Sequence, residues 1–280
     1  MLKNSIKYIY HYTSAESLLG MTHDPTDDEK KNIEANGYNL DYGYYLEFHA
    51  SDINLMNDKS ENRLLKVMTD DIPDELKPVL GFAKWLTGRV YCVSFCTESD
   101  YIPMWKIYAT NNPICLKFKV DGLIDAIHKI NQNPFTETDI GECTYVTEDG
   151  FKEQAENYRK ELLKFNKEDV ERNKDLLTRL TEIIQNSAFL KLKNFDYEKE
   201  VRLAAFETRA SDYKQGRYGI SLYNTIKIPL RFLEEIVIGP SANQDILEYT
   251  VSGLLKSKGY DKLKQYGVKI KVTKTNVDLR

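Results

Sequence analysis

The chain has 280 residues, of which 41% are hydrophobic and 29% are charged. A chain of this length can bury a substantial core as one large domain or two small ones. It contains no run of about 18 apolar residues, and its first six residues lack the apolar core of a signal peptide. The composition therefore argues against a membrane-spanning helix, and we expect a cytoplasmic protein with no membrane partner.

The charges are unevenly distributed along the chain, although the formal net charge is only −4. Residues 21–62 hold ten acidic residues against three lysines, a net of −7, and residues 252–280 hold eight basic residues against two acidic ones, a net of +6. The total gives no overall footprint of a nucleic-acid-binding protein. The basic C-terminal region still permits a surface that meets a polyanion, while solvated charge is the commoner explanation.

The four cysteines indicate neither a disulfide framework nor a zinc site. They stand at positions 92, 96, 115 and 143, form no C-x-x-C pair and have apolar or aromatic neighbours. His23, His49 and His128 lack metal-ligand spacing, and no P-loop, G-x-S-x-G or G-x-G-x-x-G sequence occurs. We therefore expect no metal site and no Rossmann-type dinucleotide-binding unit.

The N-terminal region is expected to contain two strands and a short helix. An aromatic and β-branched run predicts a strand at residues 6–12, which carries His11 near its C-terminal end, and Ser14 can cap a short helix after it. The remaining assignments are a surface loop or insertion at residues 22–41, a second strand at 42–49 and a polar turn at 57–61.

The middle of the chain alternates strands and helices before a long helical block. Strands are predicted at residues 89–96, 114–120 and 141–147, and short helices at 104–108 and 122–130. Residues 150–192 have helical composition and an apolar period, with a break at 166–169. This block predicts a helical insertion or arm, which either touches a partner or only covers the sheet.

The strand pattern returns after this block. Strands are predicted at residues 200–206, 225–228, 235–239 and 268–273, and a helix at 246–259. Because strands precede and follow the helical block, the sequence predicts an α+β fold with a mixed or antiparallel sheet. We find no internal repeat and expect a single domain over residues 1–280, with 150–192 as an insertion.

Several short motifs occur along the chain in a characteristic order. They are His11-Tyr12-Thr13, Asn57-Asp58-Lys59-Ser60-Glu61, Val93-Ser94-Phe95, Met104-Trp105-Lys106-Ile107-Tyr108, Glu198-Lys199-Glu200-Val201-Arg202 and Ile236-Val237-Ile238-Gly239. The set resembles a widespread bacterial domain family of unknown function with H-Y-T, N-D-x-x-E, S-F-S, M-W-x-x-Y, W-x-x-E-x-E-x-R and I-x-x-G motifs. The chain departs from that pattern at Lys59, Cys96 and Phe195, where proline, serine and tryptophan are usual. That family in turn remotely resembles the ADP-ribosyltransferase superfamily.

The second resemblance implies an ADP-ribosyltransferase-like fold, with mixed or antiparallel sheets and flanking helices, and a cleft that binds NAD as a substrate. Glu200 would then be the catalytic carboxylate at the nicotinamide ribose, and Glu198 would orient the acceptor. Ser94 would support Glu200 by a hydrogen bond. The implied cofactor-binding residues are His11, Tyr12, Thr13, Tyr45 and Ser94, with Tyr44 as a second candidate for an aromatic face beside the cationic nicotinamide.

Elementary chemistry is consistent with these assignments. Cleavage of the bond between nicotinamide and ribose passes through an oxocarbenium-like state, which a fixed negative charge stabilises. Residues two apart in a strand point to the same face, so Glu198 and Glu200 can line one cleft. Their repulsion is expected to raise the pKa of one carboxylate. We therefore expect His11, Ser94 and Glu200 to converge on one cleft.

The residues assigned to support or acceptor binding also have plainer interpretations. They are Asn57, Asp58, Trp105, Tyr108 and Arg202. Asn57 and Asp58 suit an Asx turn, and Trp105 and Tyr108 suit the core or a cleft wall. Arg202 suits a pair that steadies Glu200, and the whole charged segment also suits a solvated edge.

The resemblance thus implies an NAD-dependent ADP-ribosyltransferase, a glycosyltransferase acting on a macromolecular acceptor, RNA, DNA or protein. The expected setting is a bacterial toxin or anti-phage defence effector, with an antitoxin or regulatory protein as a further partner. The alternatives are an NAD glycohydrolase or a nuclease on the same cleft, and a non-enzymatic binding module.

Overall fold

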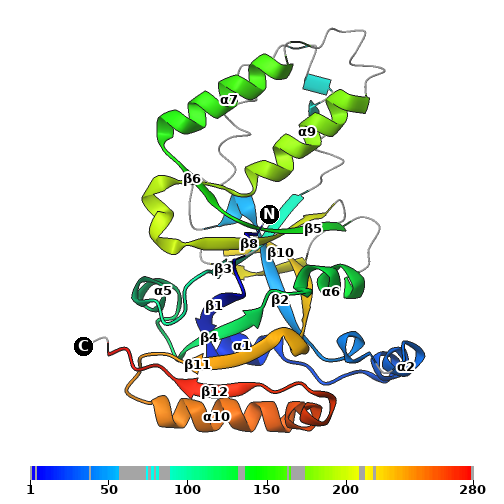
Figure 1. Ribbon diagram of the computed structural model, residues 1–280, viewed down its shortest axis with the longest axis vertical. Helices are drawn as coiled ribbons and strands as arrows, with labels where there is room; N and C mark the ends of the chain where they lie inside the picture. Colours follow the sequence, from blue (N-terminus) through cyan, green and yellow to red (C-terminus); the bar gives the residue numbers. More distant parts are fainter. Residues whose placement is uncertain are drawn as a thin grey trace.

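A computed structural model describes most of the chain. The described residues are 2–3, 5–37, 39–56, 74, 77–78, 80–81, 89–131, 136–162, 164, 174–207, 212–216 and 219–278. They form an α+β fold with a mostly antiparallel sheet, which confirms the predicted fold class (Figure 1). Within these ranges, no helix has both the length and the apolar character needed to span a bilayer.

The order of strands and helices along the chain broadly agrees with the order predicted from the sequence. The strands are β1 (Tyr8–Ser14), β2 (Tyr45–Asp52), β3 (Arg89–Cys96), β4 (Pro113–Lys119), β5 (Thr136–Glu142), β6 (Thr144–Val146), β7 (Leu190–Leu192), β8 (Glu200–Glu207), β9 (Asp212–Gly216), β10 (Gly219–Pro229), β11 (Leu233–Ile238) and β12 (Lys271–Lys274). The α-helices are α1 (Ala15–Met21), α2 (Asp27–Ala35), α5 (Ile102–Tyr108), α6 (Leu123–Ile130), α7 (Glu148–Leu162), α9 (Lys174–Ser187) and α10 (Gln244–Ser257). The described 3-10 helices are η1 (Leu40–Tyr42), η2 (Ile53–Leu55), η4 (Lys193–Glu198), η5 (Leu230–Phe232) and η6 (Tyr260–Tyr266).

The main sheet is branched. Its principal path runs β12-β11-β4-β1-β3-β2-β10-β9, and β3 also pairs with β8, which pairs with β5. The pairings are antiparallel except that of β11 with β12, and β6 and β7 form a separate parallel pair. Because β3 takes part in three pairings, the sheet divides around it, and this division positions the site described below.

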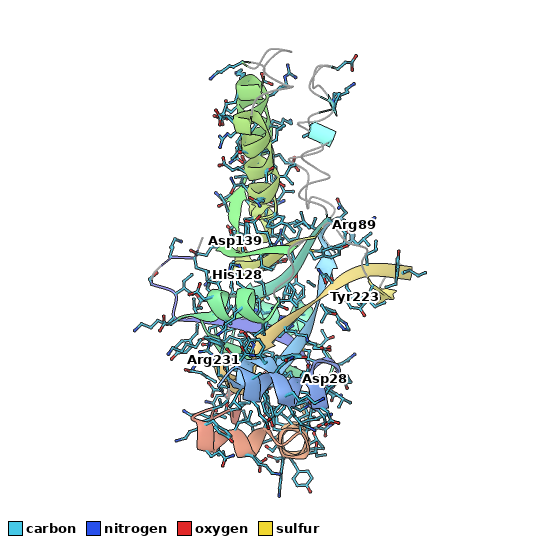
Figure 2. All side chains as sticks on the ribbon, turned by 90° about the vertical axis from the view of Figure 1, so that its right-hand side faces the viewer. Asp28, Arg89, His128, Asp139, Tyr223 and Arg231 are labelled. Carbon is cyan, nitrogen blue, oxygen red and sulfur yellow. The ribbon has the colours of Figure 1, made fainter. Side chains whose placement is uncertain are left out.

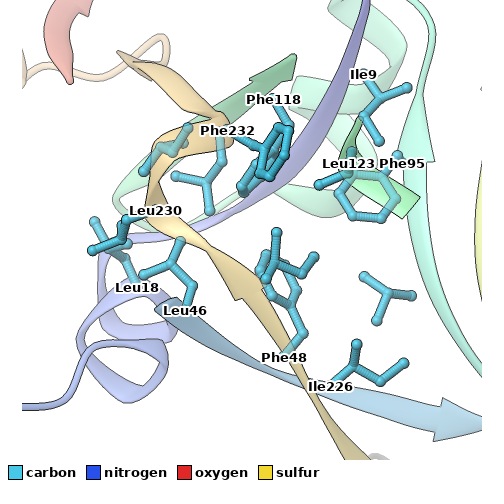
Figure 3. Close-up of a cluster of buried hydrophobic side chains, with 14 of the residues drawn as sticks. Ile9, Leu18, Leu46, Phe48, Phe95, Phe118, Leu123, Ile226, Leu230 and Phe232 are labelled. Carbon is cyan, nitrogen blue, oxygen red and sulfur yellow. The ribbon is translucent and has the colours of Figure 1, made fainter. Parts of the chain in front are cut away.

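The core lies between the branches of the sheet and the helices that cover it. Phe48, Phe95 and Phe118 come from three strands and meet at its centre, where Phe118 lies 5.9 Å from each of the other two rings (Figure 3). Such aromatic pairs contribute about 0.5 to 1.5 kcal/mol beyond the area they bury. Helix α10 adds Leu247 and Val251 from its buried face. The apolar residues of the predicted strands are thus buried together in one core.

Helices α7 and α9 form an arm that projects from the sheet (Figure 1). After a quarter turn the two helices overlap in one column above the body (Figure 2). Arg179 of α9 donates to Glu161 of α7 at 2.9 Å. Phe151 and Ile183, nearer the body, are buried. The helical prediction for residues 150–192 is confirmed in the described part, except that β7 ends the segment; the predicted break at 166–169 lies outside the described residues.

Two sequence assignments need correction. The predicted loop at residues 22–41 contains α2, which begins with a capping box in which Thr26 and Glu29 satisfy each other's backbone N–H groups. Only Ile33 of this helix is buried, so its sequence lacks the repeating apolar positions by which an amphipathic helix is recognised. The predicted strand at 141–147 is two strands in different sheets, interrupted at Cys143.

Candidate functional site

A fork in the sheet opens beside the middle of β3. On one edge β3 pairs with β8 along its whole length. On the other edge β2 pairs with it only at Tyr91 and Cys92, and β1 only at Cys96. Among the described strands none pairs with residues 93–95 on that edge. Strands β1 and β2 therefore separate there, and the backbone of β3 faces a cleft.

The cleft has a volume of about 760 Å³. Its lining combines residues that are distant in sequence, including His11, Glu47, Ser94, Tyr108, Lys191, Glu198 and Glu200. The predicted convergence of His11, Ser94 and Glu200 is thus observed. Small-molecule sites commonly measure about 300 to 1,000 Å³, so the cleft is large enough for a nucleotide-sized ligand.

Glu200 is almost completely buried, with 3% of its surface exposed, and four donors surround its carboxylate. Oε1 accepts from Ser94 Oγ at 2.6 Å and from Arg202 Nε at 2.8 Å. Oε2 accepts from Lys191 Nζ at 2.9 Å and from Arg202 Nη2 at 3.0 Å. A carboxylate has about four acceptor positions. All of them are used, so the expected support by Ser94 and by Arg202 is present.

The pKa of Glu200 reflects these contacts. Burial by itself raises the pKa, but the positive charges of Arg202 and Lys191 and the hydrogen bonds from Arg202 and Ser94 outweigh it and lower the pKa to about 2. The repulsion expected between paired carboxylates therefore does not govern Glu200. Two buried cations face two buried carboxylates, and the cluster is close to neutral rather than negative.

Glu198 reaches the same cluster from a different element. It ends η4, and Lys199 follows it in the left-handed region at φ 47° before β8 begins at Glu200. Its Oε1 accepts from Tyr108 Oη at 2.7 Å, and Oε2 accepts from Lys191 Nζ. The expectation that both carboxylates share one strand face is wrong, because Glu198 precedes the strand; they meet through Lys191.

His11 joins the far side of the cleft to β3. Its Nδ1 lies 2.8 Å from the carbonyl oxygen of Ser94. A carbonyl oxygen only accepts, so Nδ1 carries the proton and donates. Burial lowers the pKa of His11, and the bond to Ser94 opposes this only in part. The imidazole is therefore neutral at pH 7, and its Nε2 is an acceptor.

Several predicted site residues are built into the neighbouring core. Tyr12 lines the cleft, but its hydroxyl donates to the carbonyl of Glu98 and its ring packs edge-on against Trp105 at 4.8 Å. Trp105 is 1% exposed and donates to Asp100. Thr13 is buried and is not part of the cleft lining. The plainer interpretation of Trp105 as a core residue is therefore correct.

The aromatic candidates at the start of β2, Tyr45 and the preceding Tyr44, lie outside the cleft. The hydroxyl of Tyr45 donates to Glu29 and accepts from Lys227 at 2.7 Å, and its ring stacks on His23 at 4.2 Å. Tyr44 packs toward Tyr260. The expectation that they offer an aromatic face in this cleft is wrong. The reason is position along β2: the cleft is lined by residues further along the strand, from Glu47 to Ser51, whereas Tyr45 stands at its start and contacts Glu29 of α2.

Other aromatic residues do border the cleft. Tyr108 and Tyr197 are 39% and 36% exposed, and Phe195 lies beneath the ammonium of Lys191 at 5.1 Å from the ring centre. Lys191 was not among the predicted site residues, because a single lysine in the short strand β7 has no distinguishing feature in the sequence. The predicted residues Asn57 and Asp58 lie outside the described part of the chain.

Comparison with known proteins gives one similarity. Residues 104–203 match the family described as "Protein of unknown function (DUF2971)". This segment includes Tyr108, Lys191 and the residues from Glu198 to Arg202, but not His11 or Ser94. No curated protein and no solved structure matches the chain. The similarity agrees with the expected relation to a domain family of unknown function.

Proposed function

We propose that the cleft binds NAD and that the protein transfers ADP-ribose to a macromolecular acceptor. The observation that carries the proposal is the hydrogen-bonded chain at the sheet fork. His11 donates to the carbonyl of Ser94, and Ser94 Oγ donates to Glu200. Three residues from three strands are thereby held in one cleft of about 760 Å³. The resemblance to the ADP-ribosyltransferase superfamily implies that these same residues bind NAD, support the catalytic carboxylate and supply it.

The residues of the cleft fit the chemical groups of NAD. The Nε2 atom of neutral His11 can accept a hydrogen bond from a ribose hydroxyl group. Tyr108 and Tyr197 offer partly exposed aromatic faces, which attract a cationic nicotinamide ring and hold the neutral product less well. These aromatic residues take the part that the sequence had assigned to Tyr45.

Glu200 supplies the negative charge once Lys191 leaves its Oε2. The reaction breaks the bond from the ribose to nicotinamide and joins that ribose carbon to an acceptor nucleophile, whose proton passes to a carboxylate. Of the cations on Glu200, Arg202 is held by two contacts to the carboxylate and one to the carbonyl of Ala188. Lys191 has a flexible stem, and the diphosphate of NAD competes for its ammonium. The freed Oε2 then faces the ribose.

The neutral cluster also favours a second candidate, a binding module without catalysis. Every acceptor position of Glu200 has an internal partner, and Glu198 is held by Tyr108 and Lys191. A wholly structural role for the carboxylates needs no NAD. A toxin or anti-phage defence setting rests on the sequence resemblance alone and belongs to the same proposal.

The test is incubation of the full chain with NAD labelled in its adenylate part, with and without cell lysate. Nicotinamide release is followed by chromatography, and the label is sought in the separated protein and nucleic-acid fractions. Label in a macromolecular fraction is the expected result. Nicotinamide release with all label left in soluble ADP-ribose indicates a glycohydrolase, and absence of both NAD binding and nicotinamide release refutes the proposal in favour of the binding module.

Two substitutions at His11 sharpen this test. His11→Asn puts an amide N–H near the position of Nδ1, so it can keep the bond to Ser94 while removing the acceptor at Nε2. We expect it to weaken NAD binding by about tenfold, the loss of one hydrogen bond to an uncharged ligand group. Calorimetric titration measures the change, and thermal unfolding checks the fold. Unchanged NAD affinity in a folded His11→Asn protein would remove His11 from the site.

A further inference from the structure

A second hollow, separate from the cleft, lies where β4, β11 and the segment before β12 meet. It measures about 290 Å³ and shares no lining residue with the cleft. Its cationic lining residues are Lys117, Arg231, Lys269 and Lys271, and its acidic ones are Glu234 and Glu235. Arg231 is labelled in Figure 2, on the body below the arm. The cationic residues come from separate parts of the sequence, so the fold and not one charged run assembles them.

Strand register explains how these charges gather. Glu235 of β11 pairs with Lys117 of β4 on one side and with Lys271 of β12 on the other. Cross-strand neighbours share a face of the sheet, so the three side chains form one row. The β4–β11 register shifts between Leu233 and Glu235, which is a β-bulge. A bulge re-aims side chains, and here the consecutive residues Glu234 and Glu235 both line the hollow.

The charges of the hollow do not cancel. Glu235 accepts from Lys117 at 3.4 Å and from Thr273 Oγ1 at 3.0 Å. Arg231 is bonded through Nε to Asp41, at 2.8 Å. Lys269 and Lys271 are exposed, and neither has an acidic partner within the part of the chain that the structure describes. With Asp41 counted, three carboxylates oppose four cations, so one positive charge is left over at this concave surface, on the side of Lys269 and Lys271.

We infer that this hollow binds the phosphate backbone of a single-stranded nucleic acid. Aromatic rings accompany the cations, as in single-strand binding sites, where lysines follow the backbone and rings stack on bases. Lys117 Nζ lies 4.3 Å from the ring centre of Tyr8, and Tyr266, 55% exposed, directly precedes the lining residue Gly267. The inference that the hollow binds nucleic acid is independent of the proposed function. The further step, that this nucleic acid is the acceptor of ADP-ribose, rests on the proposed function.

The test is fluorescence anisotropy of labelled single-stranded RNA and DNA, with no NAD present. The variant reverses both unpaired charges, Lys269→Glu with Lys271→Glu. The matched control reverses Lys262 and Lys264, two exposed lysines of η6 that do not line the hollow. We expect the variant to weaken binding roughly tenfold or more and to lower the salt slope by about 0.7 for each lost phosphate contact. The control should change affinity about threefold at most.

Three outcomes overturn the inference: no binding of either oligonucleotide, equal weakening in both double variants, or binding to phosphatidylserine vesicles or polyglutamate as strong as to the oligonucleotides. Circular dichroism of each variant checks its fold, and Lys269→Ala with Lys271→Ala provides a milder change with the same expected direction. Nicotinamide release by the same protein without oligonucleotide tests the cleft separately, so failure of one proposal does not appear as failure of the other.

Discussion

Replacement of Glu200 by glutamine should destabilise the protein strongly at neutral pH. The substitution keeps the shape of the side chain but removes the charge that Arg202 and Lys191 share. Lys191 keeps Glu198, whereas Arg202 loses the carboxylate to which both its Nε and its Nη2 donate. The amide of glutamine also replaces one acceptor oxygen by an N–H₂ group, which then faces the donors of Ser94, Arg202 or Lys191. A catalytic test based on Glu200→Gln alone is therefore confounded by stability.

The size of the effect follows from the pKa of the buried carboxylate. Its fall from 4.5 to about 2 corresponds to a contribution on the order of 3 kcal/mol, since each pH unit of depression is worth about 1.4 kcal/mol. Removal of one partner from a buried ion pair costs about 3 to 5 kcal/mol in general. Since domains are stable by only about 5 to 15 kcal/mol, the loss is a large fraction of the total.

The stability difference between the wild type and Glu200→Gln should also depend on pH. The pKa of Glu200 is lower in the folded state than in the unfolded state, so its contribution is complete above about pH 4.5 and disappears as the pH falls toward 2. Urea unfolding of the wild type and Glu200→Gln should therefore differ by about 3 to 5 kcal/mol at pH 7, and the difference should shrink below pH 4.5.

A matched control is Glu98→Gln, which removes an ion pair with Lys199 whose side chains are both more than 40% exposed. Exposed pairs contribute about 0 to 1 kcal/mol, so this variant should unfold nearly like the wild type. A Glu200→Gln protein within about 1 kcal/mol of the wild type at pH 7 would show that the carboxylate does not hold the buried cations as argued.

Two further substitutions, each paired with a control, test the packing against Trp105 and at the base of the arm. Gly239→Ala should cost about 1 to 3 kcal/mol, because a Cβ there would lie 2.5 Å from Trp105; Gly253→Ala, with open space around it, should be neutral or slightly stabilising, and urea midpoints compare the two. Phe151→Ala should cost about 3 to 5 kcal/mol in the same assay if the base of the arm belongs to the core, while Lys152→Ala should stay within about 0.5 kcal/mol; an arm variant that unfolds like the wild type would mean that α7 is only appended.

The local sequence predicts elements well where the apolar pattern is strong. The strand that carries His11 and the helix capped by Ser14 are both present, and Ser14 accepts from the N–H of Ser17 as a cap should. Helix α2 was missed because it buries a single residue, Ile33. Its capping box was legible in the sequence, but without an apolar face the acidic composition favoured a loop.

Contacts between distant segments were beyond the reach of local patterns. Nothing in Val93-Ser94-Phe95 tells that β1 and β2 pair with β3 only at its ends. The contact of Gly239 with Trp105 is similar, because it joins two motifs whose order was noted and whose packing was not. The order of the motifs led us to expect that His11, Ser94 and Glu200 lie together, and the division of the sheet around β3 is the physical reason that they do.

The Glu-x-Glu pair shows why a correct location can follow from a wrong premise. Strand alternation would have put Glu198 beside Glu200, but Lys199 is left-handed, which costs a residue other than glycine about 1 kcal/mol. That conformation is held by backbone hydrogen bonds: the carbonyl of Lys199 accepts from Thr97 N–H at 3.0 Å, and the N–H of Lys199 donates to the carbonyl of Asp196 at 3.2 Å. The carboxylates then meet at the ammonium of Lys191, which no spacing rule selects. Two acids in such a motif are therefore not in themselves a negative site, and their chemistry depends on whether a ligand can draw that ammonium away.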